Sequence, residues 1–401
     1  MNKQYAYKFR LRPIQKKATA MARMAGCCRL VWNKALSLQK ERLEKKEKLL
    51  SYVQLASLLV GWKKDLPFLQ EAPSQSLQQT LKNLDRALRE GLRKTNPKQF
   101  PRYKKKSMHD SFLYPQGYKL DQDNARIYLP KIGFVRYKKS RFVEGTLKNV
   151  TVSKHCHKWY VSLQVEIDEP EKVHTSTAVL GIDVGIATFA MCSDGTQIKP
   201  LNSFKKHEHR LAFLQKRLSR KKKYSKNWNR QKNTVSKCHA KISNCRKDFL
   251  HKITTTISKN HAVVVLEDLK VSQMSKSAKG TVESPGKNVS AKAGLNKSIL
   301  DQGWHEFRRQ LDYKLRWLGG KLITIRPEYT SKQCSECGCL DNDNRKSQAV
   351  FECVACGYKD NADFNAAKNI RAAGLAVLGC GGNDLSHPMK QQPTVLRSIA
   401  F

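Results

Sequence analysis

Two short apolar runs, each ending in a carboxylate, constrain the fold of this chain more than any other feature. VLGID ends at Asp183, and VVVLE ends at Glu267. Continuous apolar runs of this length are typical of strands buried on both faces, as in parallel sheets. Because ligands bind at the carboxyl ends of parallel strands, we expect the two acids to converge at one edge of a sheet.

A third carboxylate, Asp363, opens the run DFNAAKNI, which predicts a helix. Each acid alone suits a strand-end turn or a helix N-cap. Together, three acids without a paired cation repel one another, and a divalent metal is the usual compensating charge. Two metals shared by such acids cleave phosphodiesters. The three acids therefore predict a metal-dependent catalytic site, with Asp360 as a nearby rival for the third position.

The charge of the chain indicates a polyanionic partner. There are 76 Lys and Arg residues against 33 Asp and Glu, which gives a net charge of +43. We favour nucleic acid over an anionic membrane, because the sequence contains no apolar stretch of membrane-spanning length and no signal-peptide pattern. With no export signal, we expect a cytoplasmic protein with reduced thiols.

Four cysteines form a regular pattern, Cys334-x2-Cys337 and Cys353-x2-Cys356. A glycine follows each pair, which lets the backbone turn around a tetrahedral ion. The spacing is that of a four-cysteine zinc site, which we favour over a redox pair. Four protein ligands leave no coordination position open, so the zinc is expected to be structural rather than catalytic. Cys339 is a spare neighbour.

Two basic segments are candidates for contacts with nucleic acid. In the first, Arg102 and Lys104 alternate with aromatic residues, a pattern that suits phosphate contacts and base stacking but that an alternating sheet surface also produces. In the second, Arg220, Lys221, Lys222 and Lys223 form a single-sign run. Such a run is usually a solvated face, but the length of the basic stretch and its single sign favour a phosphate-contacting arm.

The pattern along the chain predicts several segments. A strand is expected at 5–12, where apolar and polar residues alternate, and helices are expected from 14 to 95. A β-rich region then extends to 170. The remaining expectations are a domain junction at 173–178, a basic helical stretch at 205–260, a loop at 270–297, a helix at 298–318 and a disordered tail from Gly374.

Taken together, these motifs resemble the TnpB family, the transposon-encoded RNA-guided nucleases that are related to type V CRISPR effectors and to Fanzor proteins. In the first half the resemblance is carried by KFRLRP (8–13), GCCRLVWNKAL (26–36), LQQTLKNLDRAL (77–88), PRYKKK (101–106) and KWYVSLQVE (158–166). In the second half it is carried by GIDVGIATFA (181–190), VVVLEDL (263–269), PEYTSKQCSECG (327–338) and DNADFNAAKNI (360–370).

The resemblance implies an α/β fold with a RuvC/RNase H-like nuclease domain and an inserted zinc ribbon. A wedge-like β-barrel, interrupted by a helical recognition segment, would precede it. The implied bounds are 1–13 and 96–172 for the barrel, 14–95 for the recognition segment, 178–330 and 358–373 for the nuclease domain, 331–357 for the ribbon and 374–401 for the tail.

By position in the motifs, Asp183, Glu267 and Asp363 match the catalytic triad of the family, which would hold Mg²⁺ or Mn²⁺. The four regularly spaced cysteines match its zinc ligands. The family pattern selects Asp363 over Asp360, because the catalytic Asp stands two residues before the NAA segment.

The resemblance further implies a guide RNA and a double-stranded DNA target as partners, in a prokaryotic cell. Base pairing with the guide, rather than side chains, would read the target sequence next to a short adjacent motif. Two alternatives are a transposase that performs strand transfer and a guided DNA-binding repressor. The order of the acids, with the ribbon before the last one, favours the nuclease, and the intact triad argues against the repressor.

Overall fold

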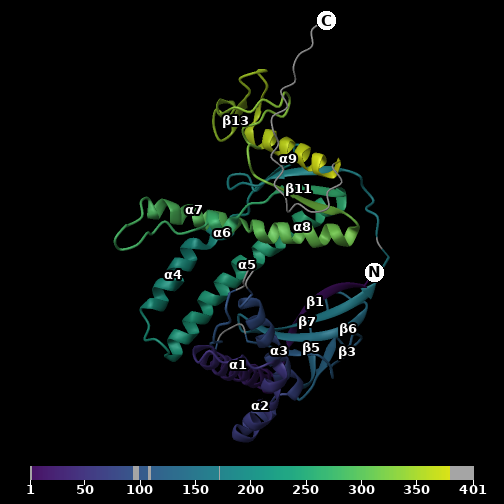
Figure 1. Ribbon diagram of the computed structural model, residues 1–401, viewed down its shortest axis with the longest axis vertical. Helices are drawn as coiled ribbons and strands as arrows, with labels where there is room; N and C mark the ends of the chain where they lie inside the picture. Colours follow the sequence, from purple (N-terminus) through teal and green to yellow (C-terminus); the bar gives the residue numbers. More distant parts are fainter. Residues whose placement is uncertain (1, 94–98, 107–109, 171, 380–401) are drawn as a thin grey trace. The chain divides into compact units, whose positions relative to one another are not determined.

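The computed structural model of the protein divides into two compact units, Met1–Pro170 and Glu171–Phe401 (Figure 1). The described residues are 2–93, 99–106, 110–170 and 172–379. The division falls close to the junction expected at 173–178. The expected boundary between 95 and 96 and most of the expected tail lie outside the described residues.

The first unit contains a seven-stranded antiparallel sheet with the order β2-β6-β7-β1-β5-β4-β3. The strands are β1 (Asn2–Arg12), β2 (Ser111–Tyr114), β3 (Lys119–Asp121), β4 (Arg126–Leu129), β5 (Gly133–Tyr137), β6 (Thr146–His155) and β7 (Lys158–Asp168). β1 joins the two halves of the sheet, because it pairs with β7 along most of its length and with β5 at Leu11 and Arg12. Within the described residues the edge strands β2 and β3 do not pair with each other, so closure into a barrel stays a prediction.

The helices of the first unit share one core with this sheet. They are α1 (Gln15–Glu44), α2 (Tyr52–Asp65), the short 3₁₀ helix η1 (Pro67–Glu71) and α3 (Ser74–Gly91). One face of α3 is a stripe of fully buried leucines at helical spacing that packs against α1, formed by Leu77, Leu81, Leu84 and Leu88. Ser51 and Gln54 form a capping box that fixes the start of α2.

The second unit contains a five-stranded mixed sheet with the order β10-β9-β8-β11-β12. Its strands are β8 (Val179–Asp183), β9 (Ala190–Cys192), β10 (Gln197–Ile198), β11 (Val263–Glu267) and β12 (Lys321–Ile325). β8, β11 and β12 are parallel, whereas β9 and β10 are antiparallel to their neighbours. The two apolar runs are therefore adjacent parallel strands, as predicted.

Helices cover both faces of this sheet. The α-helices of the second unit are α4 (Glu208–Ser219), α5 (Lys226–Asn260), α6 (Val271–Met274), α7 (Val289–Gln302), α8 (Trp304–Leu318) and α9 (Ala362–Gly379). Of these, α4 packs on α5 in a separate cluster. Leu180 and Leu266 belong to the core shared with α5 and α8, whereas Val265 packs with Ile370 of α9. α8 and α9 accordingly lie on opposite sides of β11 (Figure 1).

Three expectations about the second unit were wrong. The loop expected at 270–297 contains α6 and the first part of α7, and Lys292 Nζ donates to the carbonyl of Met274 at 2.8 Å, which ties these helices together. The helix expected at 298–318 is two helices, because Gly303 has a left-handed φ of 76° and approaches the Arg246 side chain closely.

The third error concerns the end of the chain, where α9 continues to Gly379 instead of ending before Gly374. Gly374 is a packing residue rather than a helix terminator. A Cβ built at Gly374 would lie 2.3 Å from the Val265 side chain.

Among the helices of the described residues, none is long and apolar enough to cross a bilayer.

Candidate active site and zinc-binding cluster

Asp183 and Glu267 lie next to each other at the carboxyl ends of β8 and β11. Ile182 pairs with Leu266 in the parallel register, so the two acids follow directly after paired residues. Side chains alternate between the two faces of a strand. Because Val265 faces α9, Glu267 faces α9 as well, and the register gives Asp183 the same direction.

Asp363 approaches the same face from the first turn of α9. This helix comes very close to β8 at Gly181, where a Cβ would lie 2.4 Å from the carbonyl oxygen of Ala367. Glycines at 181 and 374 therefore let the helix pack on the strands without intervening side chains. The structure thus brings together the three acids that the sequence singled out.

The electrostatics of the three carboxylates reflect this proximity. Burial, followed by the charges of Glu267 and Asp363, raises the pKa of Asp183 to about 7. Burial also raises the pKa of Glu267 and that of Asp363. Carboxylate oxygens are ligands that Mg²⁺ and Mn²⁺ prefer, and a bound cation would offset the mutual repulsion of the three acids.

Two polar partners of these acids were missed by sequence reasoning. Thr330 donates its hydroxyl to Oε1 of Glu267 at 2.5 Å, and Arg345 forms an ion pair with Asp363 in which Nη2 and Oδ1 are 3.5 Å apart. Thr330 lies in the motif before the first cysteine pair, so its position carried a signal. Arg345 lies inside the ribbon in a segment without any pattern.

Asp360, the rival aspartate, has different partners. It lies on β14 (Lys359–Asn361) and accepts hydrogen bonds from Tyr358 and Lys368. Burial opposes its ionisation, but the hydrogen bonds from Tyr358, the backbone of Asn361 and Lys368 outweigh burial and lower the pKa of Asp360. The two aspartates therefore differ in their pKa, which is lowered for Asp360 and raised by burial for Asp363.

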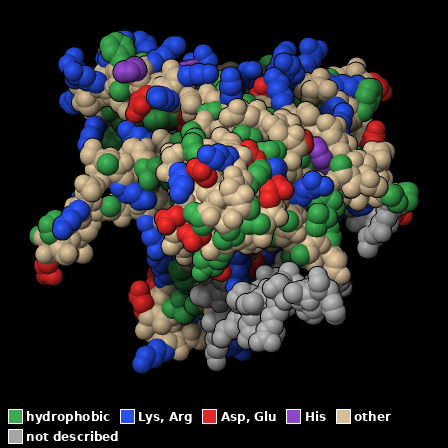
Figure 2. Space-filling view, turned by 90° about the horizontal axis from the view of Figure 1, so that it is seen from above, with side chains coloured by type: hydrophobic (Ala, Val, Ile, Leu, Met, Phe, Trp, Pro, Cys, Tyr) green, Lys and Arg blue, Asp and Glu red, His purple; other side chains and the backbone are tan. Residues whose placement is uncertain are grey.

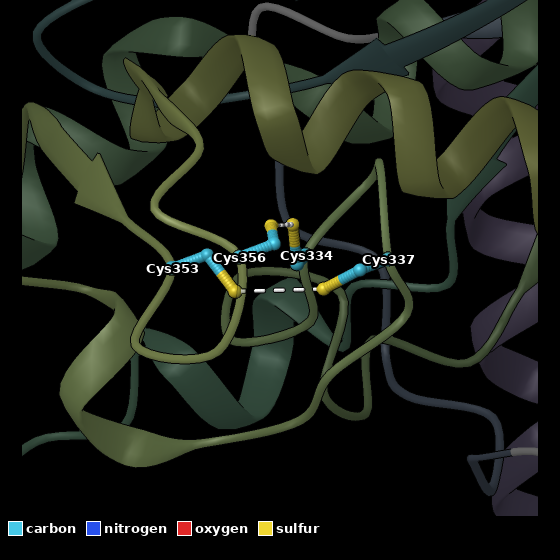
Figure 3. Close-up of side chains that lie close together, drawn as sticks. All are labelled: Cys334, Cys337, Cys353 and Cys356. Carbon is cyan, nitrogen blue, oxygen red and sulfur yellow. Dashed lines mark hydrogen bonds between the residues drawn. The ribbon is translucent and has the colours of Figure 1, made fainter.

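The four regularly spaced cysteines converge on one point (Figure 3). The sulfurs of Cys334 and Cys356 are 3.7 Å apart, and those of Cys337 and Cys353 are 3.5 Å apart. A tetrahedral ion with Zn–S bonds of about 2.3 Å holds its sulfurs about 3.8 Å apart. The spacing is far longer than a disulfide bond and fits zinc.

The backbone around these cysteines forms two matching turns. Gly338 donates to the carbonyl of Cys334 and Gly357 to that of Cys353, both at 3.0 Å. Both glycines have a positive φ, as the sequence predicted. Cys339 is not part of the cluster, and its carbonyl instead accepts the N–H of Cys334 at 2.9 Å.

A cleft of about 560 Å³ borders Glu267. Its walls are largely apolar, with contributions from the end of β11, from α6 and from α8. Cationic and imidazole groups also line it, at Lys270, His305 and Arg308. A cleft of this size and lining is typical of small-ligand sites.

The first pair of nucleic-acid candidates lies against α1. Lys104 exchanges two backbone hydrogen bonds with the Asn33 side chain, and its ammonium lies 3.7 Å from the centre of the Trp32 ring. Arg102 has an exposed side chain, while its carbonyl accepts the indole N–H of Trp32. The segment is therefore held in place by its backbone, with its basic groups at the surface.

The second set, Arg220–Lys223, forms the turn between α4 and α5. The next residue, Tyr224, is 83 % exposed and its ring centre lies 5.5 Å from that of Trp228. Sequence reasoning overlooked this aromatic pair. Lys and Arg side chains are spread over the face of the molecule shown in Figure 2, as the net charge requires.

Three family models match the chain. One described as a probable transposase covers residues 162–278, one described as a Cas12f1-like TNB domain covers 304–370, and one described as a helix-turn-helix domain covers 1–48. The last region consists of β1, α1 and the residues that follow α1.

Two of the curated relatives match over almost the whole chain. The chain is 52 % identical to a putative RNA-guided DNA endonuclease, InsQ, from Escherichia coli, over 98 % of both chains. It is 33 % identical to a putative RNA-guided DNA endonuclease from Streptomyces pristinaespiralis, over 98 % of this chain and 94 % of that one.

Among solved structures, a Cas12f1–sgRNA–target DNA complex resembles the chain with a TM-score of 0.55 at 15 % identity, covering 89 % of this chain and 83 % of that one. At this identity the likeness concerns the fold alone.

Proposed function

Because the chain belongs to the TnpB family, the OrfB proteins of IS605-type elements, we infer that it is an RNA-guided DNA endonuclease of a transposable element. It binds a guide RNA and cleaves target DNA next to a short adjacent motif. The relatives that match over nearly their whole length carry this activity in their names. The net charge of +43 suits a protein that holds a long RNA and a heteroduplex.

We propose that Asp183, Glu267 and Asp363 are the catalytic carboxylates. The observation that carries this proposal is their convergence on one face of the sheet, where the charges of Glu267 and Asp363 add to burial in raising the pKa of Asp183. With Mg²⁺ or Mn²⁺ bound, the metal would stabilise the charge that develops on the oxygens of the scissile phosphate.

The neighbouring side chains prepare these acids for that task. Thr330 holds one oxygen of Glu267 and thereby directs the other, and Arg345 balances the charge of Asp363. Zinc at the four-cysteine cluster would be structural, since all four coordination positions are occupied by protein.

The domain layout is part of this proposal. The sheet at β8–β12 with its flanking helices supports a RuvC-like nuclease domain at 178–330 and 358–373, interrupted by the ribbon at 331–357. The sheet of the first unit supports a wedge-like domain at 1–13 and 96–172, with α1 to α3 as the recognition segment.

The second candidate is DNA strand transfer, because one matching family model is described as a probable transposase. Both activities would use the same carboxylates, so the acids alone do not separate them. Dependence on a guide does separate them. A guided repressor would retain target binding without cleavage.

The test is to sequence the RNA that co-purifies with the protein and then to change its variable end. We expect the cut site to move with the new guide sequence, and mismatches beside the adjacent motif to be the most damaging, because heteroduplex formation begins there. The Asp183→Ala protein with the same RNA is the control, which should bind the target without cutting it. A cut site that stays in place, or equal cutting by RNA-free protein, would favour the transposase.

A further inference from the structure

A single hydroxyl joins the loop before the zinc ribbon to the carboxylates. Thr330 follows β12 and is 9 % exposed, and its hydroxyl donates to Oε1 of Glu267 at 2.5 Å. Its backbone carbonyl accepts the side-chain N–H of Asn369 at 2.9 Å. The hydroxyl that orients Glu267 is therefore itself fixed from α9.

Two asparagines, one helical turn apart on α9, hold the backbone around the first cysteine pair of the zinc cluster. Asn369 also donates to the carbonyl of Gln333 at 2.7 Å. Asn365 donates to that same carbonyl at 2.8 Å and accepts the N–H of Ser335 at 2.9 Å. These bonds fix the residues on both sides of Cys334, and both amides are buried.

The chemistry of these contacts requires carboxamides. Asn365 acts as a donor and an acceptor at once, whereas a carboxylate could only accept, and the Gln333 carbonyl would then keep only the hydrogen bond from Asn369. An apolar side chain would leave buried backbone groups unpaired, which is unfavourable. The two asparagines therefore hold the backbone around Cys334 by specific hydrogen bonds, in addition to any role in the packing of α9.

We propose that Thr330, Asn365 and Asn369 are positioning residues, through which the fold of the zinc ribbon sets the affinity of Glu267 and Asp363 for a divalent cation. The proposal rests on the proposed function, since it takes these acids as metal ligands. Asp363 lies on the same helix as the two asparagines, so a shift of the ribbon against α9 changes the placement of both acids together.

The test measures Mn²⁺ binding to the full-length protein by the electron paramagnetic resonance signal of free Mn²⁺. Subtracting the binding of Asp183→Ala isolates the nuclease site from other cation sites. Loss of a hydrogen-bonding partner of a metal ligand typically weakens affinity about 10–100-fold. We expect that loss for Thr330→Val with stoichiometric zinc retained, and recovery of wild-type affinity in Thr330→Ser. Asn369→Ala should show the same loss of Mn²⁺ affinity.

The matched control is Asn229→Ala, because Asn229 also donates to two backbone carbonyls, those of Tyr224 and Ser225, but in the turn before α5. Its Mn²⁺ affinity should equal that of the wild type. In Cys353→Ser, Mn²⁺ affinity should fall by a similar factor, and adding Thr330→Val should then have little further effect, since both changes break one path.

Two outcomes have different meanings. If wild type and Asp183→Ala bind Mn²⁺ equally, the metal site of the proposed function is wrong. If wild type binds and Thr330→Val or Cys353→Ser binds as tightly, the positioning inference alone is overturned. Thr330→Val nearly preserves side-chain volume, so it keeps the inference testable even if Asn369→Ala does not fold.

Discussion

The contact between α9 and β8 at Gly181 offers a direct perturbation of the candidate active site. Gly181 does not have a positive φ, so alanine is strained there only by its contacts. Its Cβ would lie 2.4 Å from the carbonyl oxygen of Ala367 and 2.5 Å from the backbone nitrogen of Arg371. Both are backbone atoms of a helix, which no rotamer change can move.

The expected magnitude can be worked out from these distances. To restore an ordinary contact of about 3.5 Å, α9 has to recede from β8 by about 1 Å. Overpacking of this kind typically destabilises a protein by about 1–3 kcal/mol. Asp363 moves with the helix, and a displacement of about 1 Å in a reacting group can reduce the rate roughly 100-fold. We therefore expect Gly181→Ala to remain folded but to cut DNA roughly 100-fold more slowly than wild type.

The assay is single-turnover DNA cleavage by the RNA-bound protein, together with thermal unfolding of the same samples. Gly294→Ala is the matched control, because Gly294 lies inside α7 and a Cβ there meets nothing within 4 Å. It should cleave like wild type and gain about 0.5–1 kcal/mol of stability. Cleavage by Gly181→Ala at the wild-type rate would refute the argument that α9 places Asp363.

Three further predictions address the acids and the zinc cluster. Each of the variants Asp183→Ala, Glu267→Ala and Asp363→Ala should abolish cutting in a cleavage assay while target binding persists in a gel-shift assay. The control Asp360→Ala should retain most activity. If Asp360→Ala abolishes cutting and Asp363→Ala does not, Asp360 is the catalytic aspartate. Elemental analysis should find stoichiometric zinc in wild type and in Cys339→Ser but not in Cys353→Ser. The ribbon of Cys353→Ser should unfold, because the binding of structural zinc contributes about 10–16 kcal/mol to folding. Equal zinc in all three proteins would exclude the four-cysteine site. With no Mg²⁺ or Mn²⁺ added, the stabilising effect of a neutral Asp183 should be fully present below about pH 4 and be lost as the pH rises through about 7, because the pKa of Asp183 is raised in the folded protein. Thermal unfolding of Asp183→Asn should lack this loss. Parallel pH profiles of the two proteins would contradict the prediction.

The parts of the site that could be predicted are those written locally in the sequence. An apolar run that ends in an acid fixes the end of a strand, so the positions of Asp183 and Glu267 were predictable from β8 and β11. The cysteine spacing and the glycines after each pair likewise indicate the knuckle turns directly. The helix that begins before Asp363 was also predicted correctly.

The errors arose where tertiary contacts decide the outcome. In the sequence Gly374 indicates the end of a helix, but in the structure it is the residue that lets α9 pack against Val265. Gly303 interrupts a continuous helical pattern at the point where the chain approaches α5. Thr330 and Arg345 contact acids that are distant in the sequence, so no local pattern relates them. Charge patterns gave candidate nucleic-acid contacts but not their geometry.

Helix α9 explains why these local and distant features meet at one place. Its inner face is reduced to small or apolar residues, Ala367, Ile370 and Gly374, because the strands lie directly beneath it. Asn365 and Asn369 face the ribbon instead. Asp363 occupies the first turn, where the helix dipole favours a negative charge. A turn has 3.6 residues, so inserting one residue within the helix rotates all later residues of the helix by about 100° relative to the earlier ones. Such an insertion between Asp363 and Ala367 would keep α9 helical but could not keep the carboxylate, the ribbon contacts and the sheet contact in register together.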